Sequence, residues 1–330
     1  MQWRNQNMNN HHVEDDGFAV WVVPIDKRDG SCDVDLHINQ WIMPSRKTSS
    51  VKVFSDFGIR VSHAHNISNI CFFVPFDMKE SYTDLSKKLK NPDISRGIFN
   101  TNCTINANDG RNIFELSYNS HQSNVLEMIP RMKGVNNGVL VTFDLKSIID
   151  SLTKDEVYVR FRIKNSKLGV FLEKESKMIE SFATLLSSPI IKEGYSYTIR
   201  VNEMRCLPDE IRRDIFLQEQ KVKKIILTVC MNGQLLIDNN TCYKTRTLEK
   251  ALYKDYIPSN FISENCMVYQ WLQEKPNGSH YNLTTTFYKE YINKKSFLIY
   301  AIFVVLFSAL GGGVVEIIKL IISYTLKSFL

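Results

Sequence analysis

The stretch SFLIYAIFVVLFSALGGGVV, residues 296–315, decides the architecture that this sequence predicts. Its 20 residues include no charged residue and no proline. A helix of about 20 residues, rising 1.5 Å per residue, is about 30 Å long and can cross the hydrocarbon of a bilayer. About a dozen strongly apolar side chains, at roughly −0.3 to −0.6 kcal/mol each, favour insertion by several kcal/mol. We therefore predict a C-terminal membrane segment over residues 293–330, with a buried core helix as the alternative.

The residues that flank this stretch predict its orientation. Lys289, Lys294 and Lys295 precede it, whereas only Lys319 and Lys327 follow it. Positive charge is retained on the cytoplasmic side of a membrane, which favours a cytoplasmic N-terminal side. Residues 1–16 are polar and contain no apolar core of a secretory signal. We expect a tail-anchored protein of the inner (cytoplasmic) membrane, with the bulk of the chain in the cytoplasm.

The apolar run continues through Glu316–Lys327 and leaves two topologies open. In a helical hairpin, Gly311–Gly313 would form the turn, and each arm of about 14 residues would span only about 21 Å, which is short for a bilayer. In a single helix the glycines stay helical, and Glu316 and Lys319 can pair because residues three apart share a face. We favour the single helix and keep the hairpin as the alternative.

Small and polar residues of the segment fall on one stripe. At about 100° per residue they share an arc of roughly 100°, and they are Ala301, Ser308, Gly312, Glu316, Lys319, Ser323 and Lys327. Such a stripe is costly against lipid, but it permits close approach between copies of the helix or lines a pore. The predicted self-association and pore residues are Ala301, Ser308, Gly311, Gly312, Gly313, Glu316, Lys319 and Ser323. The alternative is that the glycines merely fit the helix and that the charges extend to water at the interface.

The composition of the whole chain is that of an ordinary globular protein. Its 330 residues are 44% hydrophobic and 23% charged, which excludes collagen-like, wholly disordered and polytopic membrane proteins. The 41 Lys and Arg against 35 Asp and Glu give a net charge of +6, with no domain-wide excess that would mark a nucleic-acid binder. Seven cysteines without a C-x-x-C pair favour a reducing cytosol.

Alternating and β-branched segments predict a β-rich α+β fold. The expected strands span residues 18–25, 34–42, 51–61, 69–76, 157–163 and 195–201. In the second of these, Val34, Leu36 and Ile38 alternate with polar residues, which predicts a strand whose polar face meets water. The expected helices are one capped by Ser81 and Asp84, one over 145–152 capped by Asp144, one over 175–186 and one over 210–220.

Two Asn-Gly pairs predict β-hairpins. Asn232-Gly233 would join strands 222–231 and 234–237, and Asn277-Gly278 would join strands 266–273 and 281–288. The outgoing strand of the second hairpin leads almost directly into the apolar segment. We expect a β-rich N-terminal lobe over residues 1–150, a second α+β lobe over 151–292 and the membrane segment over 293–330.

Catalytic motifs are absent from the sequence. It contains no phosphate-binding loop, no G-x-G-x-x-G, no nucleophile elbow and no H-E-x-x-H. We therefore expect neither an enzyme nor a cofactor, and we assign no catalytic or metal-ligating residue. The candidates for contacting a nucleotide or nucleic-acid phosphate are Arg212, Arg213, Lys221, Lys223 and Lys224. Acidic residues are interleaved with them, so a solvated helix face is the alternative.

A soluble region without a catalytic motif, followed by the short apolar segment Phe297–Leu326, resembles the membrane effectors of bacterial antiphage defence. It is most similar to the two-transmembrane effectors associated with retrons or with cyclic-oligonucleotide signalling systems. The resemblance implies that a reverse transcriptase with its noncoding RNA and DNA, or a nucleotide signal, controls the soluble region, with membrane damage and abortive infection as the output. Glu316 and Lys319 depart from the two-transmembrane pattern because they interrupt the second apolar run.

Three functions follow, in descending order. The first is a toxin effector whose membrane segment oligomerises and disrupts the inner membrane. The second is a tail-anchored adaptor that holds a β-rich binding module at the membrane. The third is a membrane-tethered hydrolase of unrecognised fold, although no small-molecule substrate is evident.

Overall fold

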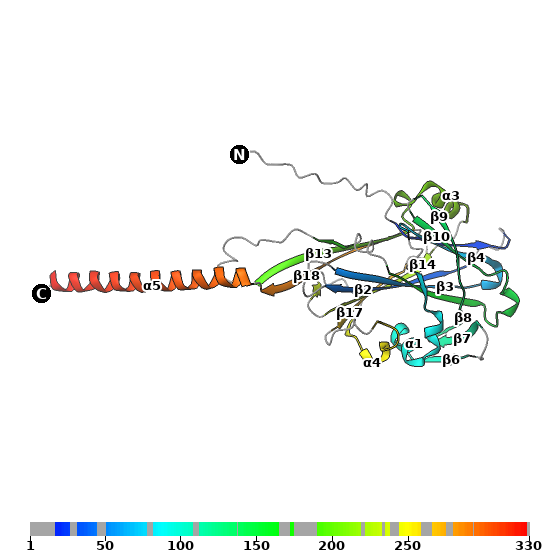
Figure 1. The fold of residues 1–330 in the computed structure, drawn as a ribbon, viewed down its shortest axis with the longest axis horizontal. Coiled ribbons are helices and arrows are strands. Elements are labelled where there is room, and N and C mark those ends of the chain that lie inside the picture. Colours follow the sequence, from blue (N-terminus) through cyan, green and yellow to red (C-terminus); the bar gives the residue numbers. More distant parts are fainter. Residues whose placement is uncertain are drawn as a thin grey trace. The chain divides into compact units, whose positions relative to one another are not determined.

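The chain has a β-rich α+β fold with several sheets and a long C-terminal helix, as the sequence predicts (Figure 1). The computed structural model describes residues 17–26, 32–44, 51–77, 82–107, 112–136, 138–164, 172–174, 190–218, 222–232, 235–237, 244–258, 266–274, 280–292 and 294–328. Contacts divide the chain into two compact units. The first holds residues 1–172, 197–233 and 239–285, and the second holds residues 173–196, 234–238 and 286–330.

A ten-stranded sheet forms the centre of the first unit. Its order is β16-β17-β14-β2-β3-β11-β8-β7-β6, with β5 paired to β11. The strands are β2 (Val34–Pro44), β3 (Val51–Val61), β5 (Tyr82–Asp84), β6 (Cys103–Asn106), β7 (Ile113–Tyr118), β8 (His121–Leu126), β11 (Glu156–Ile163), β14 (Val222–Asn232), β16 (Lys244–Thr247) and β17 (Cys266–Glu274). The β14–β2 and β11–β8 pairs are parallel. The sheet therefore unites strands that are far apart in the sequence.

A four-stranded antiparallel sheet packs on one face of this central sheet. Its order is β1-β4-β10-β9, from β1 (Ala19–Pro24), β4 (Ile67–Val74), β9 (Arg131–Val135) and β10 (Gly138–Asp144). Phe72 on β4 lies 4.8 Å from Phe57 on β3 and 5.4 Å from Phe161 on β11, ring centroid to ring centroid. All three rings are buried. Aromatic side chains of this size supply much of the apolar burial that holds the two sheets together.

The other face of the four-stranded sheet is covered by α3 (Asp209–Gln218). Neighbouring residues of a strand point to opposite faces, so Cys71 and Phe73 face away from Phe72 and pack with Ile211 and Ile215 of α3. The predicted helix over 210–220 is thus confirmed, and its apolar stripe is what fixes it to the sheet.

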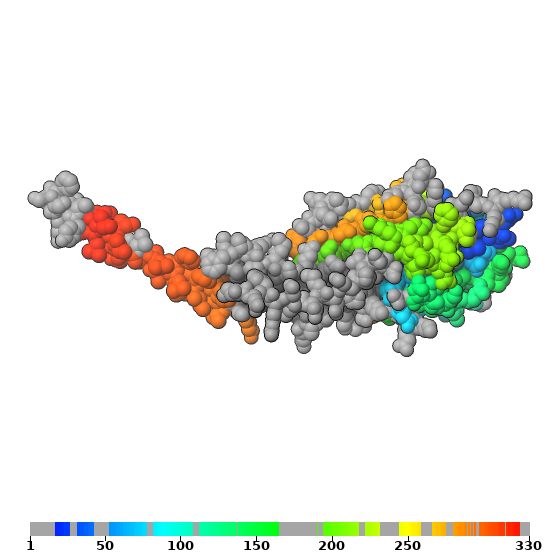
Figure 2. All heavy atoms as spheres, turned by 90° about the horizontal axis from the view of Figure 1, so that it is seen from above, coloured from blue at the N-terminus to red at the C-terminus, as the bar shows by residue number. Residues whose placement is uncertain are grey.

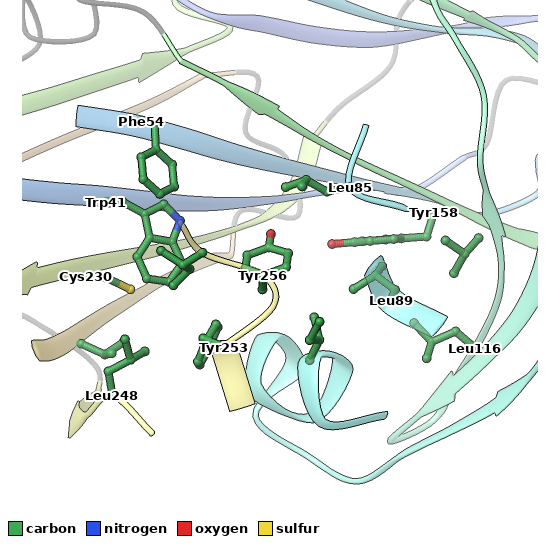
Figure 3. Close-up of a cluster of buried hydrophobic side chains, with 14 of the residues drawn as sticks. Trp41, Phe54, Leu85, Leu89, Leu116, Tyr158, Cys230, Leu248, Tyr253 and Tyr256 are labelled. Atoms are coloured by element: carbon green, nitrogen blue, oxygen red, sulfur yellow. The ribbon is translucent and has the colours of Figure 1, made fainter. Parts of the chain in front are cut away.

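The remaining face of the ten-stranded sheet is covered at one end by short helices. These are the 3-10 helix Ser86–Lys90, α1 (Pro92–Phe99) and α4 (Lys250–Tyr253). In Figure 3, Trp41 and Phe54 from the sheet meet Tyr253 and Tyr256 from the α4 segment, and the Trp41 and Phe54 rings stack at 5.7 Å. Tyr158 lies in the same cluster.

The second unit contains α5 (Lys294–Ser328) and parts of a sheet with the order β12-β13-β18-β15. The strands of that sheet are β12 (Leu172–Lys174), β13 (Ile190–Val201), β15 (Leu235–Ile237) and β18 (Tyr281–Ile292). The boundary between the units falls within β13 and within β18. One residue separates the end of β18 from the start of α5, so the strand leads directly into the helix, as expected.

All six strands expected between residues 18 and 201 form, whereas both predicted hairpins are wrong. β15 pairs with β18 instead of β14, and β17 pairs with β14 and β16 instead of β18. In each predicted hairpin, the second strand belongs to a different sheet from the first. Pairing with distant strands overrides the local turn signal. Gly233 and residues 275–279 lie outside the described residues.

Two helix predictions are also wrong. Asp84 ends the short strand β5, and a 3-10 helix follows it in place of the expected α-helix. The Asp84 carboxylate accepts a hydrogen bond from the Ser86 backbone at 3.0 Å. Asp144 accepts from the Lys146 backbone at 3.1 Å and precedes only a turn and a 3-10 helix, Ile149–Ser151. Both aspartates stabilise turns in the way that short acidic side chains often do. The helix expected over 175–186 lies outside the described residues.

The compact units also differ from the lobes expected over 1–150 and 151–292. Strands from both sides of residue 150 share the ten-stranded sheet, since β11 pairs with β3.

Candidate functional site

The predicted membrane segment forms one unbroken helix, α5, rather than a helical hairpin (Figure 1). Gly311, Gly312 and Gly313 are helical, and a Cβ atom on any of them would have no neighbour within 4 Å. Lys319 Nζ donates to Glu316 Oε1 at 3.0 Å, the pairing expected of a single helix. All of the predicted stripe residues therefore lie on one continuous helix.

Most of the described apolar side chains of α5 are exposed (Figure 2). By length and composition, the 27 residues Phe297–Ser323 can cross a membrane, and 0% of their most apolar window is buried. Leu310 is 64% exposed and Leu320 is 65% exposed. A core helix would bury such side chains, because exposing a leucine instead of burying it costs roughly 1.5–3 kcal/mol.

A second feature lies in the first unit, where the polar face of β2 is buried. Asp35, His37 and Asn39 are 4%, 8% and 6% exposed. The expectation that this face meets water is wrong, because the end of α1 and the β7–β8 turn cover it. Strand periodicity gives the two faces correctly but does not say what packs on them.

These buried polar side chains line a cavity of about 100 Å³. Strands β2, β3, β14 and β17, the β7–β8 turn and the end of α1 contribute its walls. The lining residues are Asp35, His37, Asn39, Arg60, Ile98, Phe99, Tyr118, Asn119, His121, Lys224, Ile226, Thr228 and Gln270. A smaller hollow of about 20 Å³ shares Asn39, Ile98, Thr228 and Gln270 with it and adds, among others, Lys244 and Arg246. We call the two together the polar groove.

Charge pairs hold Arg60 and Lys224 in the wall of the groove. Arg60 bonds to the Asp35 carboxylate and donates to Glu156 Oε1 at 3.0 Å. Lys224 Nζ lies 2.9 Å from Glu274 Oε1. The guanidinium of Arg60 also contacts the ring of His121. The arrangement fixes the side chains around the cavity in place.

His37 lies neutral in the wall of the groove. Burial lowers the pKa of His37 from 6.5 to about 3, with further lowering by the cationic Arg160, Arg60 and Lys224. Its Nδ1 atom lies 3.4 Å from the Tyr158 hydroxyl. A neutral imidazole can donate one hydrogen bond and accept another.

The first unit also contains a buried polar network centred on Asp56. Arg162 donates to both carboxylate oxygens of Asp56, at 2.6 and 2.9 Å. Tyr256 donates its hydroxyl to Asp56 at 2.8 Å, and the Trp41 indole donates at 2.9 Å. Arg160 donates to the Tyr256 hydroxyl at 2.7 Å. The network contains two arginines against one carboxylate, so these groups together carry a net positive charge.

The basic residues predicted to contact phosphate are not brought together as one cluster. Arg212 pairs with Asp209 within α3, and Arg213 donates to the Asp209 carbonyl at 3.4 Å. Lys223 donates to Asp33 at 2.8 Å, whereas Lys224, on the other face of β14, lines the groove. Lys221 lies outside the described residues.

Sequence reasoning missed the groove apart from Lys224. The only sequence signal for the groove is that polar residues occupy alternate positions of otherwise apolar strands, as in β2. The same pattern is typical of a strand with one face exposed to solvent.

Comparison with known proteins assigns no family to this chain. No family model matches it, and no curated protein matches it. Among solved structures, a similar one is the yeast delta-COP-I mu-homology domain complexed with the Dsl1 WxWxV peptide. The two are 8% identical, the match covers 80% of this chain and 77% of that chain, and the TM-score is 0.21. A likeness of that size carries no argument about fold or function.

Proposed function

We propose that this protein is a membrane effector. In this proposal α5 spans the inner membrane, copies of α5 associate through the stripe that contains Gly312, and the assembly makes the membrane leaky. The first unit lies in the cytoplasm and controls α5. The protein has no catalytic role in this account.

The observation that carries the proposal is the continuous helix, with its exposed apolar side chains and its polar stripe. The exposed leucines and isoleucines of α5 need a lipid environment or a partner. If α5 contacted only lipid, the charged side chains of Glu316 and Lys319 would face hydrocarbon, which is energetically costly. Association of several helices, stripe to stripe, gives these charges polar neighbours and lets the glycines bring backbones close together.

The biological setting we propose is antiphage defence, with abortive infection as the outcome. It rests on the resemblance of the architecture to retron-associated effectors, and the proposed partners are a reverse transcriptase with its RNA and DNA, or a nucleotide signal. Copurification from detergent, with mass spectrometry and nucleic-acid extraction, tests this setting separately from the membrane activity.

The membrane activity is tested by expressing the full chain in bacteria and recording a membrane-potential dye. We expect depolarisation with the wild type. Glu316→Lys and Lys319→Glu alone should each reduce it, because like charges then face each other three residues apart. The double exchange, Glu316→Lys with Lys319→Glu, should retain more activity than either single change. Equal signals from all four chains and from an empty vector would contradict the proposal.

The second candidate is a tail-anchored adaptor, and the polar groove is the observation that favours it. A hollow in which polar side chains and a residue of shifted pKa converge is a candidate binding site, and a binding module needs only to be held at the membrane. Replacing residues 296–323 by an unrelated apolar helix of equal length distinguishes the two. An adaptor keeps its function after this replacement, whereas an effector loses the depolarisation.

A further inference from the structure

Two residues in the wall of the larger cavity of the polar groove each carry a buried polar atom without a partner. Within the described ranges of the chain, no group forms a hydrogen bond with Asp35 Oδ1 or with Tyr118 Oη. The two residues are 4% and 6% exposed, and both line the cavity. Leaving such an atom unpaired costs free energy, and a ligand that supplies the partner removes that cost. The pair therefore indicates where a ligand would bind.

Asp35 and Tyr118 lie at the same end of the cavity. The Arg60 guanidinium bonds to Oδ2, the other carboxylate oxygen of Asp35, and it also contacts the His121 ring. His121 lies opposite Tyr118 at the β7–β8 turn, and their ring centroids are 5.4 Å apart. One small ligand can therefore contact both Asp35 and Tyr118.

The charges at this end of the cavity favour a neutral ligand. An anion would meet the Asp35 carboxylate, whose free oxygen can only accept a hydrogen bond. Arg60 and Lys224, which could attract an anion, already pair with carboxylates. Burial, followed by the cations Arg160 and Arg60, lowers the pKa of His37 to about 3. The ammonium group of a ligand would meet the same two effects beside His37, so a cation is disfavoured as well.

The polar and apolar walls together fit a molecule with several hydroxyl groups. Asp35 Oδ1 requires a donor, and the Tyr118 hydroxyl can either donate or accept. A hydroxyl group serves both of them without carrying a charge. Ile98, Phe99 and Ile226 add apolar surface to the same cavity, against which the carbon chain of such a molecule can pack.

The volume of the cavity limits the size of the ligand. The cavity measures about 100 Å³, whereas a cavity of about 150 Å³ holds one benzene molecule. By that comparison the cavity accommodates roughly four to six non-hydrogen atoms. A polyol with a chain of three carbons has this size, whereas a nucleotide or a polymer is too large.

We propose that the larger cavity of the polar groove binds a small neutral polyol of the size of glycerol. One hydroxyl group donates to Asp35 Oδ1, a second bonds to Tyr118 Oη, and the carbon chain packs against Phe99. The site belongs to the first unit, and it does not depend on any membrane activity of α5.

Isothermal titration calorimetry of the full chain in detergent and glycerol-free buffer tests this inference. The four probes have the same three-carbon chain: glycerol, 1-propanol, the anion glycerate and the cation 3-amino-1,2-propanediol. We expect glycerol to bind at least tenfold more tightly than each of the others. Equal binding by 1-propanol would refute recognition of the hydroxyl groups, and tighter binding by a charged probe would refute a neutral ligand. No binding of glycerol would overturn the whole proposal.

Removal of the Tyr118 hydroxyl tests the position of the ligand. Tyr118→Phe keeps the ring that stacks on Phe99 at 4.1 Å, and the lost hydroxyl has no partner among the described residues, so the variant should fold normally. It should weaken glycerol binding about tenfold. Tyr82→Phe is the matched control, because its hydroxyl is also buried and unpaired within the described ranges but Tyr82 does not line the cavity. Unchanged affinity in Tyr118→Phe, or an equal loss in Tyr82→Phe, would contradict the assignment.

A second variant tests the carboxylate. Asp35→Asn keeps the shape of the side chain but replaces the charged acceptor by an amide, and it should weaken glycerol binding about tenfold. A thermal unfolding scan shows whether this variant is folded, since Asp35 also pairs with Arg60. A folded Asp35→Asn chain with the wild-type affinity for glycerol would overturn the role of Asp35, and Tyr118→Phe decides the case of an unfolded one.

Discussion

The glycine at position 58 brings β3 close to the side chain of Tyr158. A Cβ atom at Gly58 would lie 1.9 Å from the Tyr158 hydroxyl, which is fully buried and accepts from Arg160 at 2.9 Å. Gly58→Ala should therefore lower the free energy of unfolding by about 1–3 kcal/mol, the usual cost of overpacking. Gly134→Ala, another strand glycine with no atom within 4 Å of an added Cβ, should be close to neutral. Urea unfolding followed by tryptophan fluorescence compares them, and equal losses would refute the steric explanation.

The buried His37 gives the first unit a specific response to acid. Because burial and neighbouring cations lower its pKa to about 3, the folded state stays unprotonated between pH 6.5 and 3, while the unfolded state takes up a proton. Stability should thus fall as the pH drops through that window, by up to about 1.4 kcal/mol per pH unit from this residue. His37→Gln should make the dependence shallower, as measured by urea unfolding at several pH values. An identical slope in the variant would contradict a neutral His37.

At the element scale, the structure of α5 leaves its glycines free for contact with other helices. Because a Cβ atom at Gly312 meets nothing within 4 Å, Gly312→Leu should not disturb the isolated helix, and leucine raises helix propensity by roughly 1 kcal/mol. If copies approach through the stripe, Gly312→Leu should weaken self-association about tenfold, a change of about 1.4 kcal/mol. Leu310→Phe enlarges the opposite face of the helix and is the control. Fluorescence energy transfer between labelled copies in detergent measures both, and equal association would exclude this stripe.

Elements with their own periodicity could be predicted from the sequence, whereas their partners could not. The alternation in Val34–Ile42 and the apolar run from residue 296 depend only on local chemistry, so the strand and the helix were both expected. The pairing of β2 with β14 joins residues about 190 positions apart, and no local pattern specifies it. For the same reason Asn232 failed as a hairpin signal, and the groove over Asp35 and His37 was missed. Lys224 alone was selected, for its charge rather than for its position.

The whole molecule combines a β-rich unit that contains a polar groove with a helix suited to a bilayer. Replacing α5 by an unrelated apolar helix of equal length separates the roles of these two parts. A protein that keeps its function after the replacement would favour the adaptor. One that loses the depolarisation would favour the effector.

Dye release from lipid vesicles measures directly whether α5 makes membranes leaky. The full chain is reconstituted into vesicles of bacterial lipids loaded with a self-quenched dye, beside Gly312→Leu, Leu310→Phe and a chain whose α5 is replaced by an unrelated apolar helix. We predict rapid release by the wild type and by Leu310→Phe, and several-fold slower release by Gly312→Leu and by the replaced helix. Release no faster than from protein-free vesicles, or equal release by all four proteins, would contradict the account.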